Sequence, residues 1–349
     1  MVAREVSSNF VARVLVTIGL VLLAALTVYF LGKLIDVLLL IFASVLLAAA
    51  ITGVRSLIQH LTRLSAGWSL AATYLLLLVL IAGAVVGIWP QLAEQVPEVI
   101  DKVPQALERL SDLVDRVPWA KEALEGTNDE NGNDGIHLPD HFLGFFSTTM
   151  GAIASVSLIV LIAIYLTLSP KVYVDNLLIM VPRSRRERAH ELVRAQTKSL
   201  RYWLLGRLAS MVFVGVCSWL GLMLLGVPMA FTLGLIAGLA TFIPYLGPIL
   251  GAIPALMVAL VQGPWVVLYV GILYFVVETA ESSLIYPLAT KKAVHLAPAY
   301  TVIIQLAGGV VAGIPGVILA TPLAVVGAVA IQMLYVEDVL GEDVDILGS

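Results

Sequence analysis

Charged residues are scarce in this chain. Asp, Glu, Lys and Arg make up 13% of its 349 residues, whereas 60% are hydrophobic. A soluble domain averages about a quarter charged residues. The composition therefore excludes an ordinary soluble protein and predicts a polytopic helical membrane protein. The single cysteine, Cys217, lies in an apolar segment, which excludes an intrachain disulfide.

Enzyme motifs are missing as well. Gly32-Lys33 lacks the upstream glycine and the following Ser/Thr of a phosphate-binding loop, and no GxSxG elbow occurs. His190-Glu191 is not followed by a second histidine at zinc spacing. We therefore expect no enzymatic activity, no cofactor, no metal and no nucleic-acid partner. An ATP-driven pump would need its ATPase from another subunit.

Long apolar runs dominate the sequence instead. A helix needs about 20 apolar residues to cross a bilayer, and the candidates are Val11–Leu31, Leu34–Val54, Trp68–Trp89, Thr149–Leu168, Leu208–Leu225 and Val266–Tyr286. Two longer tracts, Ala230–Val261 and Pro298–Tyr335, carry internal Gly/Pro breaks. Each could form two short spans or one re-entrant helical hairpin. The predicted fold is all-α with about eight transmembrane segments.

The distribution of Lys and Arg predicts the orientation. Residues 171–207 are strongly basic and should be cytoplasmic, while the acidic segment 91–148 should lie outside. Both termini are then cytoplasmic, and the short Lys33–Asp36 connection falls outside. The basic stretch is typical of a topology determinant; specific lipid binding or subunit docking is the alternative.

These boundaries predict six regions. They are N-terminal spans at 1–90, an extracytoplasmic amphipathic insert with its linker at 91–148, a fourth span at 149–170, a basic cytoplasmic segment at 171–207, a transport core with both broken tracts at 208–336, and an acidic tail at 337–349.

The insert has an apolar stripe at three- and four-residue steps, which indicates an amphipathic helix. Its members are Leu92, Val96, Val99, Val103, Leu107, Leu110, Val114 and Val117. Pro97, Pro104 and Pro118 should bend or segment this helix. The stripe must pack on the membrane domain, on the lipid interface or on a neighbouring subunit.

The two Gly/Pro breaks lie at Phe242–Ala255 and Gly313–Ala324. Irregular backbone survives in a membrane only where protein buries it or water lines it, so the breaks are candidates for a transport path. The path candidates are Pro244, Gly247, Pro248, Gly251, Pro254, Gly313, Pro315, Gly316 and Pro322. Close helix packing through the glycines is the alternative.

The two tracts resemble each other. Ala230-Phe231-Thr232 opens the first and Ala299-Tyr300-Thr301 the second, and GPILGAIPA compares with GVILATPLA with a one-residue shift. With the predicted topology the first tract starts outside and the second inside. If both are hairpins, they enter from opposite faces and meet near the midplane.

Two acids lie near the end of an apolar span. Glu278 and Glu281 share one helical face, and a carboxylate buried in hydrocarbon could carry a proton or a cation. Gln262 and Gln305 are further candidates for a polar lining. Alternatively, the acids sit at the headgroup boundary and face Lys291 or Lys292.

At these residues the chain resembles the autoinducer-2 exporter (AI-2E) family. The resemblance covers nearly the whole chain and rests on GLIAGLATFIPYLGPILGAIPALMVAL, ETAESSLIYPLATKKAVHLAPAY, LAGGVVAGIPGVILATPLAVV and LYVEDVLG. Many relatives have a glutamine-rich version before the acidic residue, whereas this chain has Glu278. That departure adds a charge, which puts coupling and substrate preference in question.

The resemblance implies a multi-pass secondary transporter of the bacterial inner membrane. Its implied partners are the lipid bilayer, a small polar substrate and further copies of the same chain. A pentamer is one possible arrangement of these copies. Family members are associated with export of autoinducer-2, others with Na⁺(Li⁺)/H⁺ antiport. Three hypotheses remain: proton-driven export of a small polar molecule, cation/proton antiport through Glu281 and Glu278, and an oligomeric channel or scaffold that needs no coupled acid.

Overall fold

The computed structural model describes residues 2–115, 149–285 and 297–342, and helices are the only regular elements in these ranges. Five helices are long and apolar enough to cross a membrane, or up to six if the α6–α7 pair, bent by 87°, is one span. The predicted all-α membrane fold is confirmed, while the count of about eight spans stays a prediction. The main helices are α1 (Val2–Thr62), α2 (Ala66–Gly87), α3 (Trp89–Asp115), α6 (Thr149–Leu168), α7 (Pro170–Ile179), α8 (Arg186–Leu224), α9 (Ala230–Ala240), α10 (Leu246–Gln262), α11 (Pro264–Ala280) and α13 (Pro298–Ile331).

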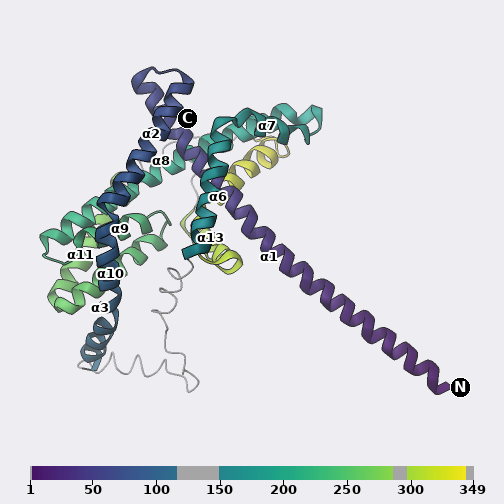
Figure 1. Cartoon of the computed structure of the whole chain (residues 1–349), viewed down its shortest axis with the longest axis horizontal. Helices are drawn as coiled ribbons and strands as arrows, with labels where there is room; N and C mark the ends of the chain where they lie inside the picture. The colour runs from purple at the N-terminus through teal and green to yellow at the C-terminus, as the bar shows by residue number, and fades with distance from the viewer. Residues whose placement is uncertain (1, 116–148, 286–296, 343–349) are drawn as a thin grey trace.

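The first two predicted spans form one helix. α1 has 61 residues and runs through the Lys33–Asp36 connection, where the sequence predicted a turn. Lys33 and Asp36 form an ion pair across one helical turn, with Nζ 3.9 Å from Oδ2. Gly32 alone disfavours the helix by only about 1 kcal/mol, which does not end it. The first half of α1 extends away from the other helices, and the N-terminus lies at its far end (Figure 1). An unbroken α1 does not return the chain to the side on which it started, and the cytoplasmic N-terminus stays a prediction.

The basic segment and the following span also form one helix. α8 is 39 residues long and crosses the predicted boundary between residues 207 and 208. Leu200 and Leu204 on its first half join a buried cluster with Leu46 of α1 and Leu319 of α13. The first half of α8 is therefore part of the packed protein, and Arg207 lies inside it rather than in a cytoplasmic loop.

The first broken tract folds as a helical hairpin, which we call hairpin A (residues 230–262). Its arms are α9 and α10, and they pack through glycine. A methyl group on Gly247 would overlap the carbonyl oxygen of Ala240, and one on Gly251 would lie 2.8 Å from Cα of Ala237. Because only hydrogen fits at these places, the two backbones approach closely.

The second broken tract, all within α13, is also a hairpin, which we call hairpin B (residues 298–331). The helical dihedrals are interrupted at Ala312 (φ −140°, ψ 18°) and Gly313 (φ 60°, ψ −142°). A methyl group on Gly316 would overlap the carbonyl oxygen of Gly308. Residues eight apart in a straight helix are about 12 Å apart, so this contact requires the chain to reverse direction.

The hairpins repeat one another in structure as well as in sequence. Thr232 and Thr301 are buried near the start of the two hairpins, and Gly247 and Gly316 begin the packed part of the two second arms. The members of each pair are 69 residues apart. The predicted internal repeat therefore corresponds to two similar helical hairpins.

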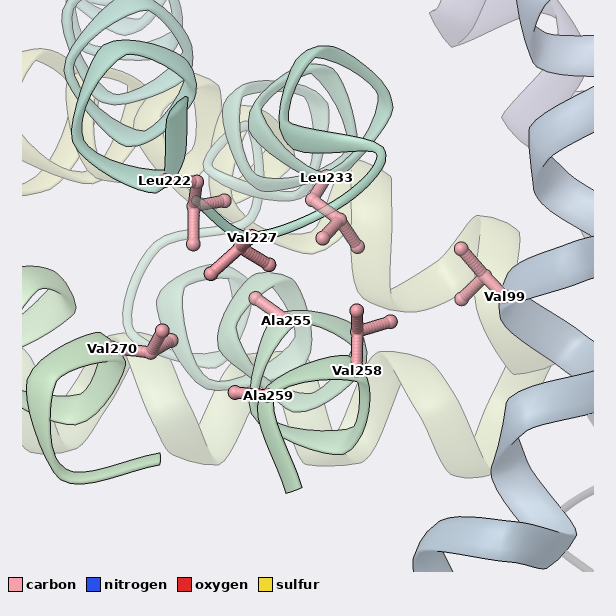
Figure 2. Close-up of a cluster of buried hydrophobic side chains, with 8 residues drawn as sticks. All are labelled: Val99, Leu222, Val227, Leu233, Ala255, Val258, Ala259 and Val270. Carbon is pink, nitrogen blue, oxygen red and sulfur yellow. The ribbon is translucent and has the colours of Figure 1, made fainter. Parts of the chain in front are cut away.

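The amphipathic helix α3 packs on hairpin A. Val99 of α3 belongs to a buried cluster with Leu233 of α9 and Val258 of α10, shown in Figure 2. Thr232 donates a hydrogen bond to Oε1 of Gln95, and Arg109 Nη1 donates to the Leu260 carbonyl oxygen at 3.4 Å. The stripe contacts the membrane domain through Val99, while contact with lipid or a neighbouring subunit stays a prediction.

Two of the three prolines lie in the described part of α3, and neither of them ends the helix. Pro97 and Pro104 lie inside α3 on exposed positions. An exposed position leaves room for the ring, and the carbonyl freed by the missing N–H can bond water. Pro118 and the side chains of Leu107, Leu110, Val114 and Val117 lie outside the described residues.

Candidate functional site

The tip of hairpin A is a strained, half-buried turn, with the Tyr245 side chain exposed. Tyr245 has φ 63° and ψ −46°, in the left-handed half of dihedral space that side chains disfavour. Leu246 N donates to the Pro244 carbonyl oxygen at 2.7 Å. This i to i+2 bond with positive φ at the central residue defines a γ-turn of the rare, strained kind. Such a turn persists only where its surroundings hold it in place.

Two side chains from other helices hold this tip. Arg207 of α8 donates from Nε to the Phe242 carbonyl oxygen at 3.1 Å. Gln305 of hairpin B donates from Nε2 to the Pro244 carbonyl oxygen at 2.9 Å. The break in hairpin A frees these carbonyls from helical bonds, and burial makes an unpaired carbonyl costly. Arg207 therefore supplies a donor to the Phe242 carbonyl, and Gln305 adds a second donor to the Pro244 carbonyl beside Leu246 N.

Aromatic packing adds to the polar contacts at the tip. The rings of Trp203 on α8 and Phe242 meet edge to face, with centroids 5.7 Å apart. Edge-to-face pairs contribute about 0.5–1.5 kcal/mol beyond their buried area. The tip is thus fixed against α8 by Arg207 through the backbone and by Trp203 through the ring.

The orientation of the Gln305 amide follows from its partners. The Pro244 carbonyl can only accept, so the amide nitrogen must face it. The same nitrogen donates to Thr321 Oγ1 at 3.1 Å within hairpin B. Gln305 is fully buried, and its Oε1 has no hydrogen-bond partner among the described residues. The side chain therefore joins the two hairpins and leaves one buried acceptor unused.

The charge of Arg207 faces a buried carboxylate. Glu281 Oε1 lies 4.0 Å from Arg207 Nη1 and accepts a hydrogen bond from the Ser210 hydroxyl. The two charged side chains are only 7% and 10% exposed. Glu281 also begins a π-helical turn, η2 (Glu281–Ile285), directly after α11. π-Helical turns occur frequently at functional sites. We call Arg207, Ser210, Phe242, Pro244, Glu281, Gln305 and Thr321 the tip network.

Glu278 lies beside the network. It is half-buried and interacts electrostatically with Glu281 and Arg207. One arginine thus faces two acids, and its Nη1 lies 4.0 Å from Oε1 of Glu281. Lys291 and Lys292, the alternative partners of the acids, lie outside the described residues.

The structure distributes the predicted path residues over three environments. Pro244 and Gln305 meet in the tip network, and Pro322 is buried next to Thr321. Gly247, Gly251, Pro254 and Gly316 are buried inside their own hairpins, while Pro248 is half-buried. Gly313 and Pro315 are exposed at the tip of hairpin B, and Gln262 is exposed at the end of α10. Gly247, Gly251 and Gly316 thus contribute to hairpin packing, and a role of these residues in a transport path stays a prediction.

Sequence reasoning missed Arg207, Ser210 and Thr321. Arg207 ends a run of basic residues, which made it look like part of a cytoplasmic loop. Its distinguishing signal is its place at the start of an apolar run, three residues before a serine on the same helical face. Ser210 and Thr321 carry no such signal, because hydroxyl residues are common in transmembrane helices.

One surface cavity of the described residues lies elsewhere. A cavity of about 320 Å³ is lined mainly by apolar residues of α8 and α9, among them Val212, Trp219 and Leu239. It lacks a charged residue, so it does not belong to the tip network. Among the described residues, no group of three or more His, Cys, Asp or Glu side chains could hold a metal. The chemistry that the tip network offers is proton exchange and hydrogen bonding to a polar solute.

Known proteins with similar sequences are described as transporters. Three of them are each named "Putative transport protein": YrrI and YueF of Bacillus subtilis (strain 168) and MT0215 of Mycobacterium tuberculosis (strain CDC 1551 / Oshkosh). YrrI is 34% identical over 147 residues, 42% of each chain. YueF is 26% identical over 191 residues, 54% of this chain and 52% of its own. MT0215 is 33% identical over 159 residues, 44% of this chain and 42% of its own. The matches thus span about half the length of these relatives.

A family match covers more of the chain. The family described as "AI-2E family transporter" matches residues 17–335, which include the tip network and both hairpins. The chain belongs to the AI-2E transporter family.

Proposed function

We propose that this protein is a secondary transporter that exports a small polar molecule resembling autoinducer-2 across the bacterial inner membrane, coupled to protons through Glu281. The observation that carries the proposal is the tip network. A buried acid, Glu281, neutralises the arginine that holds the broken tip of hairpin A. Ionisable groups inside a membrane domain are costly and are usually functional.

The proposed coupling follows from the contacts of Arg207. With Glu281 ionised, the guanidinium is attracted to the carboxylate while it donates to Phe242. Protonation of Glu281 removes that attraction and leaves the half-buried Glu278 to face Arg207. Loss of one of two counter-charges destabilises a buried cation. Arg207 would then move toward water or a solute, which frees the tip of hairpin A.

The proposed path runs where hairpin A meets hairpin B. A solute that passes there must break the bond between Gln305 and the Pro244 carbonyl. The unused Oε1 of Gln305 offers a hydrogen-bond acceptor to a hydroxyl group of that solute. This step would replace one polar contact by another, which keeps the barrier low.

A second function has a specific observation in its favour. Glu278 and Glu281 lie close enough to interact, and two acids beside one arginine can exchange a proton for a cation. This arrangement favours Na⁺(Li⁺)/H⁺ antiport as the alternative. An oligomeric channel or scaffold would need neither acid.

Proteoliposomes separate these functions. We would follow labelled autoinducer-2 and internal pH in vesicles with an imposed proton gradient, using wild type, Glu281→Gln and the control Glu187→Gln. Glu187 is an exposed acid on α8 outside the network. The proposal expects gradient-driven accumulation in wild type and in Glu187→Gln, and its loss in Glu281→Gln.

Two outcomes would count against the export proposal. Accumulation in Glu281→Gln equal to wild type would remove the acid from the coupling step. Proton movement evoked by Na⁺ or Li⁺ without autoinducer-2, and lost in Glu281→Gln, would establish the antiporter instead.

A further inference from the structure

A second arginine of α8 is held at the contact with α1, away from the tip network. Arg201 donates from Nη2 to the hydroxyl of Ser56, which itself donates to the Gly53 carbonyl oxygen at 2.7 Å. The arginine stem crosses α1 at Gly53, where an added methyl group would lie 3.5 Å from Cγ of Arg201. Two helices far apart in sequence thus position this guanidinium.

The charge of Arg201 has no opposite charge nearby among residues 2–115, 149–285 and 297–342. Its Nε is buried and has no hydrogen-bond partner, and no carboxylate within the described ranges lies at ion-pair distance from it. The hydroxyl of Ser56 is a neutral acceptor and does not offset the charge. A partly buried cation with an unused donor is costly unless an anion joins it.

Further basic residues extend this site toward the predicted cytoplasmic side. Arg194 and Lys198 precede Arg201 by seven and three residues, so the three share one face of α8. His60 follows Ser56 by one turn on α1, which runs antiparallel to α8 in the predicted topology. We call these residues, Arg194, Lys198, Arg201, Ser56 and His60, the basic seam.

The acids close to the seam are already engaged. Glu191 lies one turn before Arg194 and accepts a hydrogen bond from Arg188 Nη1 at 3.0 Å. Arg188 Nη2 also contacts Glu337 at 2.6 Å and Asp338 at 2.8 Å, which draws the acids of the C-terminal segment away. Glu187 lies one helical turn before Glu191, and its side chain is exposed. The seam therefore keeps its positive charge.

We propose that the basic seam binds the phosphate of an anionic phospholipid from the cytoplasmic leaflet, with the half-buried Arg201 as its anchor. Arginine binds phosphate through parallel N–H donors, and its unused Nε supplies one of them. The seam spans about 10 Å from Arg201 to Arg194.

Lipid titration of the purified full-length protein tests this site. We would measure thermal unfolding in neutral detergent with added phosphatidylglycerol, phosphatidylcholine or inorganic phosphate. The variants are Arg201→Gln, Arg201→Lys, Ser56→Ala and the control Arg185→Gln. Arg185 is an exposed arginine just before α8, outside the seam, so its loss changes net charge equally.

The expected result is specific for lipid, for headgroup and for residue. Phosphatidylglycerol should stabilise wild type and Arg185→Gln with the same apparent Kd, and that Kd should rise about tenfold or more in Arg201→Gln. Arg201→Lys should lie between them, because it keeps the charge and loses the planar fork. Ser56→Ala should raise the Kd less than Arg201→Gln does, because it removes the hydrogen bond that positions the guanidinium but keeps the charge.

Three results would overturn the proposal. Equal stabilisation by phosphatidylcholine would mean that binding does not depend on the charge of the headgroup. Equal Kd values for Arg201→Gln and Arg185→Gln would assign the effect to net charge. Competition by inorganic phosphate at similar affinity would replace the lipid by a free phosphate. If Arg201→Gln does not fold, Lys198→Gln combined with Arg194→Gln provides the same test.

Discussion

Hairpin A and hairpin B follow the same sequence plan but reverse direction in different ways. Hairpin A turns at Tyr245 through a strained γ-turn whose flanking carbonyls are held by Arg207 and Gln305. Hairpin B turns at Gly313, where positive φ suits glycine, and its tip is exposed. The glycine contacts between the arms are alike in both. The arms are therefore equivalent, and the tips are not.

The difference shows where a Gly/Pro break acquires a role. The tip of hairpin B relies on its own backbone, whereas the tip of hairpin A depends on side chains from two other elements. A turn that needs outside support is sensitive to any change in that support. Hairpin A is therefore the better candidate for the moving part.

The largest expected effect comes from removing the charge that supports hairpin A. Arg207→Ala leaves Glu281 buried without its cation and the Phe242 carbonyl without its donor. We expect a loss of about 3–5 kcal/mol in the free energy of unfolding, measured by denaturation in detergent. Adding Glu281→Gln should restore part of this loss. A double variant as unstable as the sum of both singles would show that the two residues act independently.

The glycines of the two arms should respond alike. Gly247→Ala and Gly316→Ala each place a methyl group on a carbonyl oxygen of the opposite arm, so each should cost about 1–3 kcal/mol. Gly271→Ala and Gly327→Ala are matched controls, because nothing lies within 4 Å of the added methyl. A much smaller loss for Gly316→Ala would break the structural equivalence of the hairpins.

The bond between the hairpins should have a moderate effect. Gln305→Leu leaves the Pro244 carbonyl without this donor, which costs about 1–3 kcal/mol. The loss should be larger than that of Thr321→Val, whose hydroxyl partners Gln305 within hairpin B alone. Thermal unfolding of both variants measures the order. The reverse order would place the importance of Gln305 inside hairpin B.

The smallest effect is expected at the tips themselves. Gly313→Ala should destabilise by about 1–2 kcal/mol, because alanine disfavours φ 60° and ψ −142°. Tyr245→Gly should be neutral or slightly stabilising, since glycine adopts positive φ without strain. The unfolding midpoint of each variant, compared with that of wild type, tests whether Gly313→Ala lowers stability and Tyr245→Gly does not. A strong loss for Tyr245→Gly would mean that its side chain, and not its backbone, supports the tip.

The sequence predicted much of the fold for physical reasons that can be named. Composition and apolar run length identified a helical membrane protein, because hydrocarbon admits little else. The Gly/Pro breaks predicted that each tract reverses direction, as two short spans or as one hairpin, and the repeat of Gly247 and Gly316 marked the equivalent arms. The turn predicted at Lys33–Asp36 was wrong for the structure described, because one glycine and two charges do not stop a helix.

The site was less predictable than the fold. Glu281 and Gln305 were candidates from their polarity inside apolar runs, but their partners come from distant parts of the chain. Arg207 lies 74 residues before Glu281, and Gln305 lies 61 residues after Pro244. No local pattern specifies such pairs.

The sequence by itself determined that the protein lies in a membrane, where its helices break and that acids lie within its apolar segments. Each of these properties depends on local composition. Only the tertiary structure decided which break became a supported tip and which polar residues met there. The physical reason is that a freed carbonyl or a buried charge takes its partner from whatever packing brings within about 3–4 Å.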